Sequence, residues 1–427
     1  MPDLDSAPAS VIETKRVLII APHSSYRTAA YIQAAQHLNI DVLIASEGKH
    51  SIVSDFAKGL HIQFADQDAA FQTIVQAAEA KPFAGVMGTD DSSLELASRV
   101  ARHFGLSHNP PSSVRLAGRK DLARDCLSQA QVRVPAFKHI FLDHAVNNQI
   151  ADINFPVVVK PMALSGSRGV IRADNTEDLR QALERVKKLL ITETQLEPEL
   201  RDQVLLEQYI PGQEVAVEGM LHQGELQILT VFDKPDPLEG PFFEETYYIT
   251  PSRHAEQILL QLQETVQQAC EAYGLVEGPV HAECRINEHG VWILEVAART
   301  IGGLCARLLT YGTGHSLEEL VLAQAMGKPL TLNVERPASG VLMIPIPEAG
   351  VFKRVEGLLE AQRVAGISDI DIQIREGYEL LPLPEGASYL GFIFAQADTP
   401  DEVEAALRKA HALLKIIVSP LFKVNVA

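Results

Sequence analysis

The sequence predicts a multidomain protein of mixed α/β and α+β class, and three observations carry this prediction. The chain has 427 residues, which at roughly 150 residues per domain corresponds to about three domains. Short apolar runs alternate with helical patterns over residues 17–110, as in a parallel, doubly wound sheet. From residue 204 to 330 apolar runs follow one another with few helices between them, which predicts an antiparallel sheet.

The first domain is expected over residues 16–110. RVLIIAP and DVLIAS are predicted strands on either side of a helix from Tyr26 to Leu38, and a helix over 69–80 leads to the strand FAGVMG. The loop APHSSYRT lacks the GxGxxG pattern, so a dinucleotide site is not indicated. Residues 1–15 have no apolar run, which predicts a disordered leader and not a signal peptide.

The second domain is expected over residues 111–330 and in two parts. A small lobe over about 120–203 contains the strand FPVVVK and a helix over 176–190. A larger lobe, 204–330, contains VLLEQYI, EVAVEGML, ELQILTVF, a long helix from Arg253 to Tyr273, and the hairpin VHAECRI–VWILEVAA. Residues 331–427 predict a further α/β unit, with a final helix over about 400–414 before KIIV.

The charge balance limits the partners of the protein. Lys and Arg number 37 and Asp and Glu 55, for a net charge of −18. Such a surface repels phosphate backbones and anionic lipid, so neither nucleic acid nor a membrane is an expected partner. The four cysteines stand singly, which predicts no disulfide framework and a cytoplasmic location. A phosphate group would need a local basic pocket.

The loop ALSGSRGV, residues 163–170, is a candidate phosphate site. Its small residues allow backbone amides to approach one anion; they are Ser165, Gly166, Ser167 and Gly169. Lys160 ends the preceding strand, and Lys120 lies about forty residues upstream. A serine–glycine turn by itself is also typical of a flexible loop, and the two lysines favour the phosphate interpretation.

The segment LLEQYIPGQE is a candidate adenine site. A strand that stops at Pro211–Gly212 presents a backbone donor and acceptor side by side, as an adenine edge requires. Glu214 follows and could accept both ribose hydroxyls. An ordinary β-turn with a solvated glutamate remains the alternative.

The predicted hairpin after residue 278 places two carboxylates opposite each other. A three-residue loop would pair Asn287 with Val291 and put Glu283 directly opposite Glu295. Two like charges across a ladder are destabilising unless a cation lies between them, and Mg²⁺ is the natural cation. A solvated acidic face is the alternative. Arg299, four residues beyond Glu295, offers a guanidinium fork for an oxyanion or carboxylate.

Other chemistries find little support. The histidines show no H-x-x-x-H spacing for zinc, and no histidine pairs evidently with a serine nucleophile. The acidic, aromatic segment FDKPDPLEGPFFEET is either a substrate-gating loop or an ordered crossover.

Taken in sequence order, these candidate residues resemble the ATP-grasp superfamily over about residues 110–330. The pattern is two lysines, a glycine-rich loop, a strand that ends before a turn, and a hairpin with two glutamates and an arginine. The N-terminal sheet resembles the pre-ATP-grasp domain of that superfamily. Within the superfamily, GPVHAECRI with ILEVAARTIGG, and the C-terminal SGVLMIPIP and SYLGFIFAQADTPDEVEAAL, are similar to the L-amino-acid ligase (bacilysin synthetase-like) group. The resemblance implies an ATP-grasp fold with a small mobile lid lobe over 120–203, a central antiparallel sheet over 204–330, and an L-amino-acid-ligase-like C-terminal domain.

The resemblance also implies roles for individual residues. Lys120 and Lys160 would contact the ATP phosphates under the loop from Ser165 to Gly169. The adenine slot would be lined by Glu207, Tyr209 and Ile210, with Glu214 on the ribose. Glu283 and Glu295 would bind Mg²⁺ or Mn²⁺, and Arg299 would act in catalysis. Ala297 departs from the asparagine that many ATP-grasp enzymes have at this position as a further metal ligand.

The implied activity is ATP-dependent ligation. A carboxylate, expected to be an amino acid, would be activated as an acyl phosphate and coupled to an amine or second amino acid, with release of ADP and phosphate. The paired glycines Gly302 and Gly303 predict a roomy donor pocket. The alternatives are a biotin-carboxylase-like or D-alanine-ligase-like ATP-grasp enzyme, and an inactive nucleotide-binding regulatory protein. Relatives of this kind are often homodimers, although nothing in the sequence shows an interface.

Overall fold

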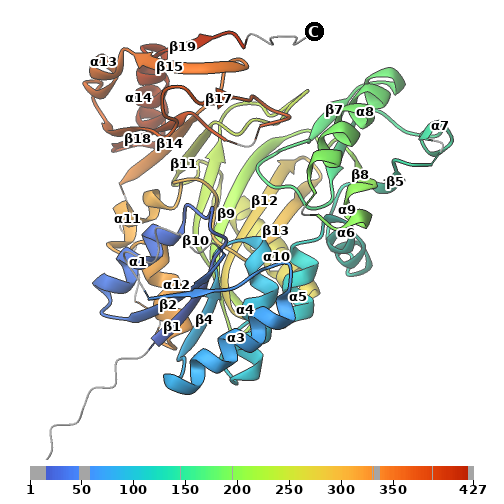
Figure 1. Cartoon of the computed structure of the whole chain (residues 1–427). Coiled ribbons are helices and arrows are strands. Elements are labelled where there is room, and N and C mark those ends of the chain that lie inside the picture. Colours follow the sequence, from blue (N-terminus) through green and yellow to red (C-terminus); the bar gives the residue numbers. More distant parts are fainter. Residues whose placement is uncertain are drawn as a thin grey trace, which may run out of the picture. The chain divides into compact units, whose positions relative to one another are not determined.

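The computed structural model describes residues 16–47, 58–144, 146–194, 196–328, 330, 337–386 and 388–421 (Figure 1). The leader predicted over residues 1–15 lies outside the described residues. The chain divides into two compact units, one of residues 1–108 and 318–330, the other of residues 109–317 and 331–427. The segment 318–330, assigned from sequence to the second domain, therefore groups with the first unit.

The first unit contains a four-stranded parallel sheet in the order β3-β2-β1-β4. Its strands are β1 (Arg16–Ile20), β2 (Asp41–Ser46), β3 (Lys58–His61) and β4 (Gly85–Gly88), and its helices include α1 (Thr28–His37), α3 (Gln67–Ala80) and α4 (Asp91–His103). All five residues of β1 are buried, which is why that strand is a continuous apolar run. The predicted N-terminal parallel sheet is confirmed.

Helix α12 (Leu317–Ala325) packs closely against strand β4 of this unit. A Cβ atom at Gly85 would lie 2.5 Å from the carbonyl oxygen of Ala325. Only glycine fits such a contact between strand and helix backbone, so the close approach requires glycine at position 85.

The second unit begins with α5 (Pro111–Ala117) and α6 (Lys120–Gln129) and continues into a small lobe. The lobe has a four-stranded antiparallel sheet, β5-β8-β6-β7, with β5 (Phe137–Phe141), β6 (Val157–Pro161), β7 (Ile171–Ala173) and β8 (Gln203–Gln208). Its helices are α7 (Val146–Gln149), α8 (Thr176–Thr192) and α9 (Pro198–Arg201). Helix α8 turns Leu179, Leu183, Val186 and Leu190 into the core of this lobe.

One strand lies in a different sheet from the one expected. Sequence reasoning grouped VLLEQYI with the antiparallel strands that follow it, but the structure pairs β8 with β5 and β6 of the lobe. Four consecutive residues of β8 are buried, because the strand has a neighbour on each side and covers on both faces.

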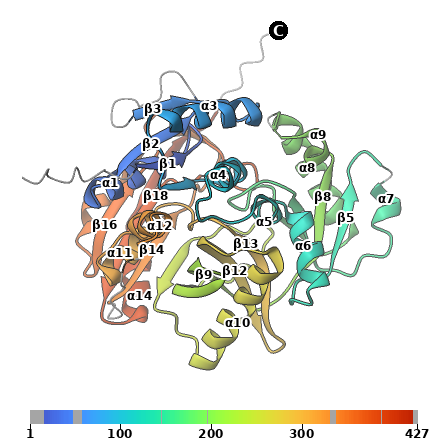
Figure 2. The same ribbon diagram turned by 90° about the horizontal axis from the view of Figure 1, so that it is seen from below.

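The central sheet has eight strands in the order β13-β12-β9-β10-β11-β14-β18-β16, and every neighbouring pair is antiparallel. The first five are β9 (Gln213–His222), β10 (Glu225–Lys234), β11 (Tyr247–Thr250), β12 (Gly278–Asn287) and β13 (Gly290–Ala297). Helix α10 (Glu256–Tyr273) packs on β13 and β10 (Figure 2). The predicted antiparallel central sheet is confirmed.

Strands of the C-terminal part extend this same sheet. They are β14 (Ala338–Ile344), β16 (Ile367–Ile372) and β18 (Gly391–Ala397), while β15 (Gly350–Glu356), β17 (Glu379–Leu380) and β19 (Lys415–Ser419) form a separate three-stranded sheet. The helices are α11 (Arg307–Thr313), α13 (Leu358–Gln362) and α14 (Pro400–Ala412), the last begun by a capping box of Thr399 and Glu402. Across the described ranges, no helix combines the length and apolarity of a membrane span.

Candidate functional site

The hairpin of β12 and β13 brings Glu283 opposite Glu295, by a route that differs from the predicted one. The turn has two residues, not three, because Asn287 pairs with Gly290. A β-bulge at Leu294 then shifts the register by one residue and restores the Glu283–Glu295 pairing. The carbonyl of Leu294 accepts a hydrogen bond from Arg124 of α6, so a helix outside the sheet satisfies the unpaired bulge residue.

The two carboxylates contact different cations. The Oε2 atom of Glu295 lies 3.2 Å from the Nζ atom of Lys120. The Oε1 atom of Glu283 lies 3.8 Å from the Nζ atom of Lys234 and 3.8 Å from the Nε2 atom of His281. Burial would raise the pKa of Glu283, but these two cations lower it well below its ordinary value.

Glu207, predicted to line the adenine slot, directs its carboxylate to two cations. Its Oε1 atom accepts from the Nε atom of Arg124 at 2.5 Å, and its Oε2 atom lies 2.7 Å from the Nζ atom of Lys160. The residue is only 1% exposed. Burial would raise its pKa, but the charges of Arg124 and Lys160 lower it to about 2. Glu207 thereby holds Lys160 at the end of β6.

The predicted phosphate loop connects β6 to β7 and has the conformation of a glycine-rich turn. Gly166, Ser167 and Gly169 all have positive φ, with 55° at Ser167. A Cβ atom at Gly169 would lie 2.7 Å from Pro161, so glycine is required there. The Nζ atom of Lys120 donates to the carbonyl of Leu164 at 3.1 Å. Lys120 therefore contacts both this loop and Glu295.

The loop also contacts the C-terminal part of the unit. The N–H of Gly169 donates to the carbonyl of Pro384 at 2.9 Å, and the Nε atom of Arg168 donates to the carbonyl of Glu385 at 2.8 Å. On α8, the guanidinium of Arg185 forks onto the carboxylate of Glu385. These contacts hold the predicted phosphate loop against the segment before β18.

Apolar side chains gather where β8 ends, at the predicted adenine slot. Val158, Leu238 and Phe243 are buried together, with the ring of Tyr209 packed against them. Tyr209 stacks on Phe243 with ring centroids 6.4 Å apart. Ile210 is buried, and its carbonyl accepts from Arg285 at 2.7 Å. An apolar, aromatic environment of this kind suits a purine ring.

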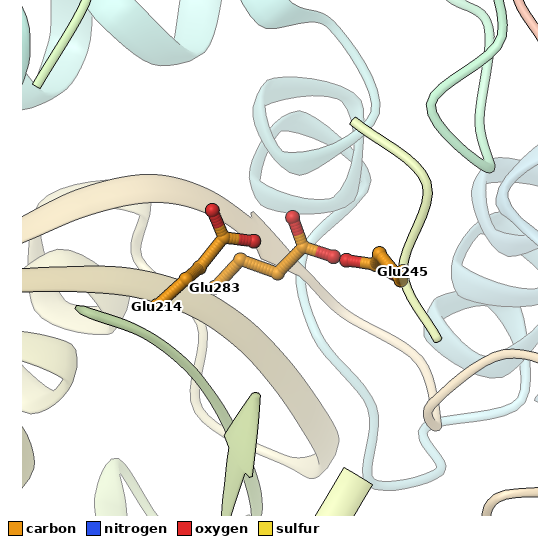
Figure 3. A group of neighbouring side chains, drawn as sticks. All are labelled: Glu214, Glu245 and Glu283. Carbon is orange, nitrogen blue, oxygen red and sulfur yellow. The ribbon is translucent and has the colours of Figure 1, made fainter. Parts of the chain in front are cut away.

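Glu214, expected to hold a ribose, is 8% exposed and already bound on both oxygens. Lys234 donates to Oε1 at 2.9 Å and Arg285 to Oε2 at 3.0 Å. Carboxylate oxygens of Glu214, Glu245 and Glu283 lie within 4.8 Å of one another. Figure 3 shows these three neighbouring side chains. Burial and the charge of Glu283 raise the pKa of Glu245.

The acidic group and the predicted metal pair share Glu283, and both supply the hard oxygen donors that Mg²⁺ prefers. Lys234 already contacts Glu214, Glu245 and Glu283, so an ammonium partly neutralises the acidic group. Glu295 forms an ion pair with Lys120, and its side chain is 33% exposed. The carboxylates of the hairpin therefore fit a divalent cation.

Arg299 lies two residues after the end of β13, and its Nη1 atom donates to the carbonyl of Thr300 at 3.1 Å. Ala297 is 2% exposed and pairs with His281 across the hairpin. The position that many ATP-grasp enzymes fill with asparagine is thus a buried ladder position beside an imidazole.

Sequence reasoning missed several polar residues around these groups. Lys234 and Glu245 both lie in FDKPDPLEGPFFEET, which stood out only as an acidic and aromatic segment. Arg285 and Glu218 lie inside apolar strands, where a lone charged residue was the available signal. His281 was considered for zinc alone. Their common feature is burial with charged partners distant in sequence.

Comparison with known protein families identifies two parts of the chain. Residues 153–307 match the ATP-grasp domain, and residues 342–419 match the L-amino acid ligase C-terminal domain 2. These ranges contain β6 to β13 and most of the C-terminal strands, including the predicted loop and hairpin.

Individual proteins are similar to this chain over most of its length. An uncharacterized protein of Sinorhizobium fredii, y4rH, is 22% identical over 418 residues, covering 96% of this chain and 85% of its own length. Alanine–anticapsin ligase of Bacillus subtilis is 24% identical over 338 residues, covering 68% of this chain and 70% of its own length. The crystal structure of L-amino acid ligase from Bacillus licheniformis matches with a TM-score of 0.79 and 26% identity, over 95% of this chain and 99% of that one.

Proposed function

Since the chain is an enzyme of the ATP-grasp ligase family with an L-amino acid ligase C-terminal domain, we propose that it activates an amino acid with ATP and couples it to an amine or a second amino acid. The products would be a dipeptide or amide, ADP and phosphate. Lys120 carries this proposal, because its ammonium contacts both the predicted phosphate loop, at Leu164, and the predicted metal ligand Glu295. One cation thus links the two elements that ATP would need.

Charge neutralisation is the main demand of the first step. A carboxylate oxygen attacks the γ-phosphorus of ATP, the bond to the bridging oxygen of ADP breaks, and an acyl phosphate forms. Lys120 and Lys160 would neutralise the phosphates, with Lys160 held by Glu207. Glu283 and Glu295 would hold Mg²⁺, which when bound neutralises phosphate charge and orients the nucleotide.

The second step needs an oxyanion partner and a dry site. The amine nitrogen attacks the acyl carbon, phosphate leaves, and the amine gives up a proton. Arg299 would stabilise the negative oxygen of the tetrahedral intermediate. Closure of the lobe that carries the phosphate loop would protect the acyl phosphate from water.

The test is phosphate release by the full chain with Mg²⁺, ATP and pooled amino acids, followed by mass spectrometry of the products. Phosphate that appears only with an amino acid and an amine, together with a condensation product, supports the proposal. A product from bicarbonate or from D-alanine alone would favour another ATP-grasp activity. Absence of stimulation by any amino acid or amine would favour a regulatory nucleotide-binding protein.

Glu295→Gln is expected to abolish turnover, because it removes one charge of the metal pair. Glu288→Gln is the matched control, since Glu288 lies on the turn of the same hairpin with a side chain 77% exposed, and it should keep wild-type activity. Retention of activity in Glu295→Gln would refute the metal assignment.

We expect the enzyme in the cytoplasm, where its four free cysteines stay reduced. We also expect homodimers, which size-exclusion chromatography would detect.

A further inference from the structure

A carboxylate lies fully buried in the middle of the central sheet. Glu218 of β9 is 0% exposed, and a charge in such a place is costly unless it is paired. Its direct cross-strand partner on β12 is His281, itself only 7% exposed. The Nδ1 atom of His281 lies 3.0 Å from the Oε2 atom of Glu218. Buried ion pairs add little net stability over apolar packing, so stability alone does not account for this pair.

Each oxygen of Glu218 leads to a different predicted site residue. The Oε2 atom of Glu218 contacts the imidazole of His281. The Nε2 atom of that imidazole lies 3.8 Å from the Oε1 atom of Glu283. His281 and Glu283 are two residues apart on β12, so their side chains share one face of the sheet. The Oε1 atom of Glu218 accepts the N–H of Ile301 at 3.1 Å, two residues after Arg299.

We propose that Glu218 is a positioning residue, which fixes the metal-ligating carboxylate of Glu283 and the loop of Arg299 relative to each other. The inference rests on the proposed function, in which both groups act on one ATP-derived phosphoryl group. Groups that contact a metal-ligating carboxylate from outside commonly orient it toward the metal. Errors of about 1 Å in such geometry are costly to catalysis.

Glu218→Gln tests the proposal, because glutamine keeps the size and can still accept from Ile301 but loses the charge that holds His281. In the full chain we expect Mn²⁺ affinity in the presence of ADP, measured by electron paramagnetic resonance, to fall about tenfold. We expect kcat to fall by at least as much, with a smaller change in the KM for ATP. Wild-type Mn²⁺ affinity and kcat in a variant with a lowered unfolding midpoint would show a merely structural role and overturn the proposal.

Asp233→Asn is the matched control. Asp233 is also a buried carboxylate of this sheet, and it accepts from Ser252 and from the N–H of Arg253. It neighbours Lys234 on β10, so its side chain points to the opposite face of the sheet. This variant should keep Mn²⁺ affinity and kcat within about twofold of wild type; a loss equal to that of Glu218→Gln would count against a specific role.

His281→Gln separates the contact of Glu218 with Glu283, which runs through His281, from its hydrogen bond to Ile301. It also tests the proposal if Glu218→Gln fails to fold. It cuts the path to Glu283 and leaves the Ile301 hydrogen bond, so Mn²⁺ affinity should fall while kcat at saturating Mn²⁺ falls less than in Glu218→Gln. Unchanged Mn²⁺ affinity would overturn the proposal. A wild-type chain that binds Mn²⁺ with ADP but forms no product would refute the proposed function alone, whereas one that binds no Mn²⁺ would refute both.

Discussion

Replacing Glu207 by glutamine removes the charge that Arg124 and Lys160 share. Its ordinary pKa is 4.5, and the two cations lower the pKa to about 2 in the folded chain. At about 1.4 kcal/mol per pH unit, this difference corresponds to about 3 kcal/mol of stability at pH 7. The size agrees with the roughly 3–5 kcal/mol lost when one partner of a buried pair is removed.

The contribution of the Glu207 charge to the free energy of unfolding depends on pH. Because the pKa is lowered on folding, the contribution is complete above pH 4.5 and is lost as the pH falls toward 2. The difference in unfolding free energy between wild type and Glu207→Gln should therefore shrink from about 3 kcal/mol at pH 7 to about 1 kcal/mol at pH 3.

Urea unfolding followed by tryptophan fluorescence measures this difference. Trp292, the one tryptophan of the chain, lies on β13 in the same unit as Glu207. Glu184→Gln is the control, since Glu184 is exposed on α8 and its substitution should change stability by less than about 0.5 kcal/mol. Equal midpoints for wild type and Glu207→Gln at pH 7, or a difference that stays constant down to pH 3, would refute the reasoning.

Three further predictions concern residues that contact the C-terminal part. Arg185 and Glu385 are 45% and 41% exposed, so a double-mutant cycle with alanine should give a coupling of only about 0.2–1 kcal/mol, weaker at 1 M salt; a coupling indifferent to salt would contradict this. Gly303 has φ 61°, and a Cβ atom there would lie 3.1 Å from the ring of Phe392, so Gly303→Ala should lower stability by about 1–2 kcal/mol. Gly303→Trp should in addition exclude bulky donor amino acids in a product assay, and an identical donor range in the two variants would contradict a pocket at this position.

The hairpin of β12 and β13 shows which features can be predicted from the local sequence and which cannot. The two strands, their antiparallel pairing and the facing of Glu283 and Glu295 were predicted from alternation and a glycine. The turn length was not, because Asn287 accepts hydrogen bonds within the turn from the His289 N–H and the Trp292 ring. The compensating bulge depends on Arg124, a residue 170 positions from the carbonyl it binds, and no local signal reports such a contact.

The partners of the charged residues show the same limit. The resemblance to the ATP-grasp superfamily implies that Lys120, Lys160 and Glu207 are site residues, but not which groups of the chain they contact. In the structure Lys120 pairs with Glu295, and Glu207 pairs with Arg124 and Lys160. Glu214, predicted at a ribose, binds Lys234 and Arg285, and the sequence indicated neither partner. Residue type and spacing say that a charge is present, whereas its partner depends on which groups burial removes from water together.

By itself, the sequence determined the classes of sheet, most strand and helix positions, and the residue types of an ATP-grasp ligase, because periodicity, glycines and motif order act over short stretches of chain. Only the tertiary structure decided that β8 belongs to the lobe sheet, that Lys234 enters the acidic group, and that Glu218 lies between Glu283 and the Arg299 loop. Those features depend on strand pairs and ion pairs between segments that are distant in sequence. Such pairs contribute to stability only when the chain is folded and the charges are buried.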